Sequence, residues 1–241
     1  VRAVAGGHVA MGAAGKIPSA LSSIKNVFDQ FTRSIHYYEL LEVAGDLEQA
    51  LGRYDEAASL YKKIAIGPPP MVVRAGRLKG DVLAAEGRYP EAIKEFEKVQ
   101  SVDLVGGFVE QEKMMACLGQ AESLLSLGRF SEAASLIRTM LSGSHPEEVP
   151  IATTNVLLGN AYSLLGRSLA EMKQDQDALI AYLTVDLVYG DAPDTHAEAL
   201  FQLFQLWNRG GYPRRAEEVR KKLMKTYPKS TWATELNPST K

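Results

Sequence analysis

A short motif recurs three times in the chain and constrains its fold more than any other feature. It reads Gly-Arg-aromatic-x-Glu-Ala and begins at Gly52, Gly87 and Gly128. An amphipathic stretch follows each copy, so the motif marks the turn of a helix hairpin. Glycine ends the first helix because it adopts a left-handed conformation without a Cβ clash. The alanine is small enough to let the two helices touch.

Three looser copies of the motif, at residues 15–20, 173–178 and 211–216, extend the register towards both ends of the chain. The six motif alanines are spaced by 37, 35, 41, 45 and 38 residues, and they are Ala20, Ala57, Ala92, Ala133, Ala178 and Ala216. A repeated unit of this length indicates stacked hairpins. The sequence therefore predicts an all-α chain of about six hairpins over residues 1–236 and a flexible tail at 237–241. Residues 1–15 are interpreted as a helix rather than as a signal peptide.

Two further positions of each repeat are expected to form its core. The residue four places after the motif alanine lies on the same helix face, and it is Tyr61, Phe96, Ile137 or Tyr182. A glycine lies seven residues before the junction position in three copies, at Gly45, Gly80 and Gly166. We expect this small residue to let the first helix approach its neighbour closely.

The combination of a small residue, Gly-x-Tyr-x-x-Ala and an aromatic residue four places later resembles the tetratricopeptide repeat (TPR) family. The resemblance covers nearly the whole chain, and it implies a right-handed α-solenoid whose repeats are helix hairpins of about 34 residues. Three features depart from the family pattern. Gly-Pro-Pro-Pro at 67–70 is expected to break the chain, a loop at 142–150 lengthens one repeat, and Lys173 replaces a junction glycine.

The C-terminal segment carries a second resemblance. Its pattern Tyr-Pro-x-Ser-x-Trp-Ala, from Tyr227 to Ala233, is similar to repeat ends in bacterial cell-envelope TPR proteins. Examples are the lipoprotein partner in outer-membrane barrel assembly and the periplasmic TPR protein of the Tol–Pal system. A plain capping turn is the alternative, in which Pro228 stops a helix and Ser230 caps the next one. The periplasm or cell envelope and the cytoplasm both stay open as locations.

Composition and motifs argue against several classes of function. A net charge of -2 gives no basic excess for a nucleic-acid backbone, and no apolar run is long enough to insert in a membrane. The sequence lacks Gly-x-x-x-x-Gly-Lys-Ser/Thr, His-Glu-x-x-His and paired cysteines. The single cysteine, Cys117, is expected to be buried, and the histidines His8, His36, His145 and His196 are scattered. We therefore expect no enzyme activity, no cofactor and no metal site.

The resemblance to TPR proteins implies a binding site on the first helix of each hairpin, where those proteins line a concave groove. Carried over to this chain, it gives as candidate groove residues Glu39, Glu42, Asp46, Arg74, Arg77, Asp81, Asn160, Arg167, Gln205 and Asn208, with Gln49, Ser163, Phe201 and Gln202 beside them. An ordinary solvated helix face is the alternative interpretation of each residue.

The candidate groove is acidic near the N-terminal end and basic in the third hairpin. Glu39, Glu42 and Asp46 follow one another at spacings of three and four, so they are expected to share a face. Arg74 and Arg77 are expected to be exposed one hairpin further on. They come nearest to the Lys/Asn/Arg set with which some chaperone-binding TPR proteins clamp a carboxylate, although the set itself is not matched.

The sequence thus predicts a non-catalytic scaffold that binds a protein or peptide, and a mixed surface charge favours a partner of mixed charge. Two alternatives stay open. The chain could be a regulatory protein that senses a signalling peptide, or the recruiting module of a larger enzyme. The oligomeric state and the identity of the partner do not follow from the sequence.

Overall fold

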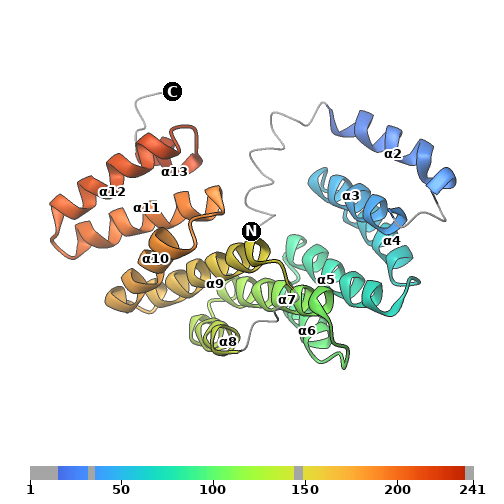
Figure 1. The fold of residues 1–241 in the computed structure, drawn as a ribbon, viewed down its shortest axis with the longest axis horizontal. Helices are drawn as coiled ribbons and strands as arrows, with labels where there is room; N and C mark the ends of the chain where they lie inside the picture. Colours follow the sequence, from blue (N-terminus) through green and yellow to red (C-terminus); the bar gives the residue numbers. More distant parts are fainter. Residues whose placement is uncertain (1–15, 32–35, 144–148, 237–241) are drawn as a thin grey trace. The chain divides into compact units, whose positions relative to one another are not determined.

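The computed structural model describes residues 16–31, 36–143 and 149–236, and these residues form helices joined by turns, without a strand (Figure 1). The helices are α2 (Ile17–Phe31), α3 (Tyr37–Ala50), α4 (Tyr54–Ile64), α5 (Pro69–Ala85), α6 (Tyr89–Gln100), α7 (Gly107–Ser126), α8 (Phe130–Ser142), α9 (Ile151–Glu171), α10 (Asp175–Val188), α11 (Pro193–Arg209), α12 (Pro213–Thr226) and α13 (Thr231–Leu236). The all-α prediction is confirmed. The predicted helix at 1–15 and the predicted tail at 237–241 lie outside the described residues.

Consecutive helices pack as hairpins, as predicted. Contacts join α3 to α4, α5 to α6, α9 to α10 and α11 to α12. Hairpins also stack on their neighbours, because α4 contacts α5 and α10 contacts α11. The chain divides into two compact units, which we call unit 1 (Val1–Ser123) and unit 2 (Leu124–Lys241). The right-handed twist of the whole array stays a prediction.

The junction glycines end the first helices as their sequence position predicted. Gly87 has a φ of 78°, and Gly52, Gly128 and Gly211 have nearly the same value. In the turn after α5, the Gly87 N–H donates to the Ala84 carbonyl, and the Arg88 N–H donates to the Leu83 carbonyl. These bonds satisfy carbonyl groups that the end of a helix leaves without partners.

Lys173 adopts the same turn without being glycine. Its φ is 62°, and it is the one non-glycine residue with a positive φ among the described residues. We expect Lys173→Gly to raise the free energy of unfolding of unit 2 by about 0.5–1 kcal/mol, since a Cβ is strained in this conformation. Urea denaturation followed by tryptophan fluorescence measures this, because both tryptophans, Trp207 and Trp232, lie in unit 2.

The matched control for this prediction is Lys221→Gly, which also lies in unit 2. Lys221 is exposed in the middle of α12, where glycine should instead destabilise the helix by about 1 kcal/mol. A loss of stability in Lys173→Gly would show that the turn tolerates lysine without strain.

The motif alanines mark the helix contacts in five of the six copies. Ala57, Ala92, Ala133, Ala178 and Ala216 are buried. The prediction for the first copy is wrong, because Ala20 is exposed while Ile17 and Leu21 are buried. The buried face of α2 therefore includes Leu21, the residue after the alanine, instead of Ala20. The large side chains of Ile17 and Leu21 bury more apolar surface than the methyl group of an alanine would.

The small residues of the first helices receive the large side chains of the second helices. A Cβ built on Gly45 would lie 2.2 Å from the ring of Tyr61. A Cβ built on Gly80 would lie 2.5 Å from the Phe96 ring, and a Cβ built on Gly166 would lie 2.8 Å from the Tyr182 ring. Each glycine thus makes room for a ring of its own hairpin, a more specific role than the close helix approach expected from the sequence.

The predicted break at the proline run and the predicted helix cap at Ser230 have different outcomes. The proline run at 67–70 does not break the fold, because Pro69 occupies the first turn of α5, where a missing N–H costs nothing. At the C-terminal end, the Ser230 hydroxyl accepts a hydrogen bond from the Ala233 N–H at 3.1 Å, as predicted for a helix cap. Trp232 of α13 then packs on Phe201 of α11, with ring centroids 5.1 Å apart.

Candidate functional site

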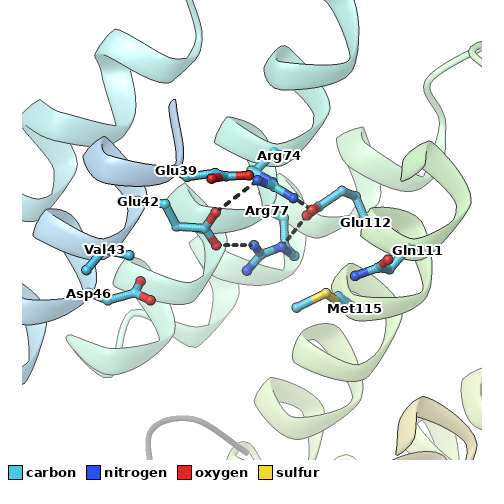
Figure 2. Close-up of a pocket in the computed structure, with 9 residues that line it drawn as sticks. All are labelled: Glu39, Glu42, Val43, Asp46, Arg74, Arg77, Gln111, Glu112 and Met115. Atoms are coloured by element: carbon cyan, nitrogen blue, oxygen red, sulfur yellow. Dashed lines mark hydrogen bonds and ion pairs between the residues drawn. The ribbon is translucent and has the colours of Figure 1, made fainter. Parts of the chain in front are cut away.

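A pocket of about 270 Å³ opens between three first helices of unit 1, namely α3, α5 and α7. It is lined by Glu39, Glu42, Val43, Asp46, Arg74, Arg77, Gln111, Glu112 and Met115. Figure 2 shows Val43 and Asp46 on one side, Gln111 and Met115 on the other, and the two arginines between them. Five of the nine residues were predicted from the sequence.

The repeat explains why these side chains meet. Glu42 and Arg77 lie 35 residues apart, both three residues before the small glycines Gly45 and Gly80. Equal register positions on stacked hairpins face the same way. Glu39, Glu42 and Asp46 therefore follow one face of α3, and all three line the pocket as their spacing predicted.

Arg77 is the centre of an ion-pair network in the lining of the pocket. Its guanidinium donates to Glu42 of α3 at 3.2 Å, to Asp81 of its own helix and to Glu112 of α7. Arg74 pairs with the same two glutamates, at 3.1 Å to Glu42 and 2.9 Å to Glu112. Each arginine thus bridges three helices, and the network ties the first helices of successive hairpins together (Figure 2).

The expected exposure of Arg77 is wrong. Its side chain is only 3% exposed, and that of Glu112 is 1% exposed. Burial of the charges is tolerated because each guanidinium faces carboxylates. Burial lowers the pKa of Arg77, but Asp81, Glu112 and Glu42 outweigh it and raise that pKa, so Arg77 stays protonated. Arg74 is also largely covered, and its guanidinium lies 4.4 Å from the centre of the Phe108 ring.

Glu112 was missed by the sequence interpretation. On α7 the position equivalent to Glu42 and Arg77, ten residues before the junction glycine, is Leu118, so the register gave no reason to select Glu112. A local signal existed, since Val109 and Ala116 lie three residues before and four residues after it on the same face, and both are buried. A glutamate on an apolar face needs a cationic partner.

Asp46 and Glu39 complete the acidic side of the pocket. The Tyr61 hydroxyl donates to Asp46 at 2.8 Å, and burial, followed by the Asp46 charge, raises the pKa of Tyr61. Glu39 is exposed at the rim and lies 2.8 Å from the His36 ring. Both carboxylates reach the pocket from α3, opposite α7 (Figure 2).

The candidate residues of unit 2 lie on α9 and α11. Those on α9 contact side chains of α11, and two of those on α11 are exposed. Asn160 is buried and accepts a hydrogen bond from the Thr195 hydroxyl at 2.6 Å. Arg167 lies 3.8 Å from Glu198 of α11. Gln205 and Asn208 are exposed. Phe201 was wrongly expected in the groove, because it is buried against Trp232.

Tyr182 is the unit 2 counterpart of Tyr61 but lacks its hydrogen bond. Its hydroxyl is buried without a partner among the described residues. The residue after the small glycine is Asp46 in the second hairpin and Arg167 in the fifth, and a guanidinium cannot accept a hydrogen bond. We expect Tyr61→Phe to lower the free energy of unfolding by about 1 kcal/mol and Tyr182→Phe to leave it unchanged or raise it.

Urea denaturation of the two single variants, followed by circular dichroism, measures this pair. Each variant controls for the other, because both remove one hydroxyl from a buried ring at the same register position. An equal loss in both variants would show that the Tyr182 hydroxyl is bonded in solution.

The remaining titratable groups of interest are buried. Cys117 is buried, as expected, and burial raises the pKa of its thiol to about 12. His196 lies in the first turn of α11, and its side chain is buried. Its ring lies 2.6 Å from an Asp186 oxygen and 2.8 Å from the Tyr227 hydroxyl. Burial opposes ionisation of Asp186, but hydrogen bonds from His196 and Lys222 outweigh it and lower the pKa.

In the described part of the chain, the histidine, cysteine and acidic side chains include no group of three or more that could hold a metal ion. None of its helices combines the length and apolar character needed to cross a bilayer.

Known proteins resemble the chain in sequence over one part and in fold over most of its length. Residues 42–102 match the family model described as tetratricopeptide repeat. No curated protein matches the chain at a significant level. Among solved structures, PilW, described as a widely conserved type IV pilus biogenesis factor, is 16% identical with a TM-score of 0.66, and the match covers 97% of each chain.

Two further structures share the fold. BtubC from P. vanneervenii is 16% identical with a TM-score of 0.67, over 88% of this chain and 89% of that one. YrrB, described as a TPR protein with an unusual peptide-binding site, is 16% identical with a TM-score of 0.51, over 87% of this chain and 96% of that one. At these identities the likeness establishes the fold alone. The chain is a TPR-like helical solenoid, in which residues 42–102 match the tetratricopeptide repeat itself.

Proposed function

We propose that this chain is a non-catalytic scaffold that binds a protein or peptide segment at the pocket between α3, α5 and α7. The observation that carries the proposal is the pocket itself, which three successive first helices form together. First helices line the groove in which repeat proteins of this architecture hold their partners. The region that matches the tetratricopeptide repeat, residues 42–102, supplies most of the pocket.

The chemistry of the pocket supports binding rather than catalysis. Catalysis needs a nucleophile or base that can reach a substrate. Arg74, Arg77, Glu42 and Glu112 neutralise one another in fixed ion pairs, which suits a rigid recognition surface. Outside the pocket, the Cys117 thiol stays protonated at neutral pH.

Photo-crosslinking from a defined position tests the proposal. Val43 is 48% exposed at the pocket, so a photoreactive phenylalanine analogue placed there should crosslink to the bound partner in extracts of the native host. The matched control carries the analogue at Lys62, which is exposed on α4. Crosslinks from position 62 but not from position 43 would place the binding face elsewhere and contradict the proposal.

For location, we propose the bacterial cell envelope, with the cytoplasm as the alternative. The support is the resemblance of the C-terminal Tyr-Pro-x-Ser-x-Trp-Ala segment to repeat ends in bacterial cell-envelope TPR proteins. The cap that Ser230 forms on α13 agrees equally with the plain capping turn. Protease protection in intact and permeabilised cells of the native host distinguishes the two. Protection that persists until the inner membrane is opened would contradict an envelope location.

A further inference from the structure

We infer that the pocket between α3, α5 and α7 accepts a basic side chain, lysine or arginine, from the bound peptide. This inference rests on the proposed function and adds the chemical class of the partner. It replaces the partner of mixed charge expected from the sequence, because the structure joins acidic and basic groups in one ion-pair network rather than in two separate patches.

Acidic groups outnumber basic ones in the lining of the pocket. The lining contains four carboxylates, those of Glu39, Glu42, Asp46 and Glu112, and two guanidinium groups, those of Arg74 and Arg77. Asp81, a fifth carboxylate, pairs with Arg77 from outside the pocket lining. This excess of carboxylates in the lining favours a positively charged group.

An anionic partner is disfavoured because both arginines already pair with carboxylates. Arg77 is almost fully buried and bonded to carboxylates of three helices, and Arg74 pairs with Glu42 and Glu112. A partner carboxylate would compete with these glutamates for the guanidinium groups. Any exchange that took both arginines from Glu112, which is only 1% exposed, would leave it buried without a cationic partner, at a large cost in free energy.

The shape of the pocket suits one long side chain. Its volume of about 270 Å³ lies below the roughly 300–1,000 Å³ of sites that enclose a drug-sized ligand. Val43 on α3 and Met115 on α7 offer apolar contacts on opposite sides (Figure 2). A lysine or arginine side chain has methylene groups for such walls and a charged head for the carboxylates.

A peptide array tests the inference. The purified chain is incubated with random dodecapeptides, all acetylated and amidated so that only side chains carry charge. We expect bound peptides to be enriched in lysine and arginine and depleted in aspartate and glutamate. The best peptide, titrated by fluorescence anisotropy, should bind about five- to tenfold more weakly to a Glu39→Gln/Asp46→Asn variant. Replacing its basic residue by norleucine should remove that difference.

The control variant is Asp55→Asn/Glu56→Gln, which removes two exposed carboxylates from α4, outside the pocket lining. Its affinity should equal that of the wild type, and thermal melts should show that both double variants are folded. Peptides that bind without a preference for basic residues, or with a preference for acidic ones, would overturn the inference and leave the proposed function standing. If no peptide of any composition binds, the proposal of peptide binding fails together with the inference.

Discussion

An Arg77→Leu variant is expected to be less stable than the wild type by about 3–5 kcal/mol, because it leaves Arg74 as the one remaining arginine of the network beside the carboxylates of Glu42, Asp81 and Glu112. Glu112 is the residue most affected, since it is 1% exposed and bonded to Arg77. Stabilities of natural domains are about 5–15 kcal/mol, so a loss of this size is a large fraction of the total. Urea denaturation followed by circular dichroism measures it.

Two further variants identify the cause of the loss. Arg88→Leu is the matched control, since Arg88 makes ion pairs with Glu86 and Glu91 at the surface and its removal should change the melting temperature little. The double variant Arg77→Leu/Glu112→Leu should recover part of the loss, because no buried carboxylate is then left facing leucine. Equal stability of Arg77→Leu and wild type would contradict the burial of the network.

The fold could be predicted from the sequence because its determinants are local and repeated. Gly87 ends a helix, Ala92 allows two helices to touch, and Phe96 fills the space beside Gly80. Each of these three roles involves neighbouring residues of one hairpin. One copy of the motif therefore predicts the structure of the other copies. The prediction was wrong at Ala20, where the copy is loosest and the helix buries a different face.

The candidate site could be predicted only in part because it depends on contacts between hairpins. The register correctly placed Glu42 and Arg77 on one surface, but it could not show that α7 would bring Glu112 against them. Whether an arginine is exposed depends on the carboxylates across from it, and these lie 35 residues away in both directions. Periodicity reveals which face a residue occupies, and only the packed structure shows what covers that face.

Phe96 provides the second large effect. A Phe96→Ala variant should lose about 3–5 kcal/mol, because a fully buried ring is replaced by a methyl group and a cavity remains. The ring lies between Gly80 of α5 and Gly119 of α7, where a Cβ would approach it to 2.5 Å and 2.6 Å. Tyr89→Ala in the same hairpin is the control, and its loss should be smaller because Tyr89 is only partly buried. Urea denaturation followed by circular dichroism compares the two variants.

The space around Phe96 allows a test in which one substitution changes the sign of its effect. Gly80→Ala should destabilise the wild type by about 1–3 kcal/mol, because its new Cβ would overlap the Phe96 ring. In the Phe96→Ala background the same substitution should be stabilising by about 1 kcal/mol, since the clash is gone and alanine favours the helix over glycine. Destabilisation of equal size in both backgrounds would mean that Gly80 is required for some reason other than the ring.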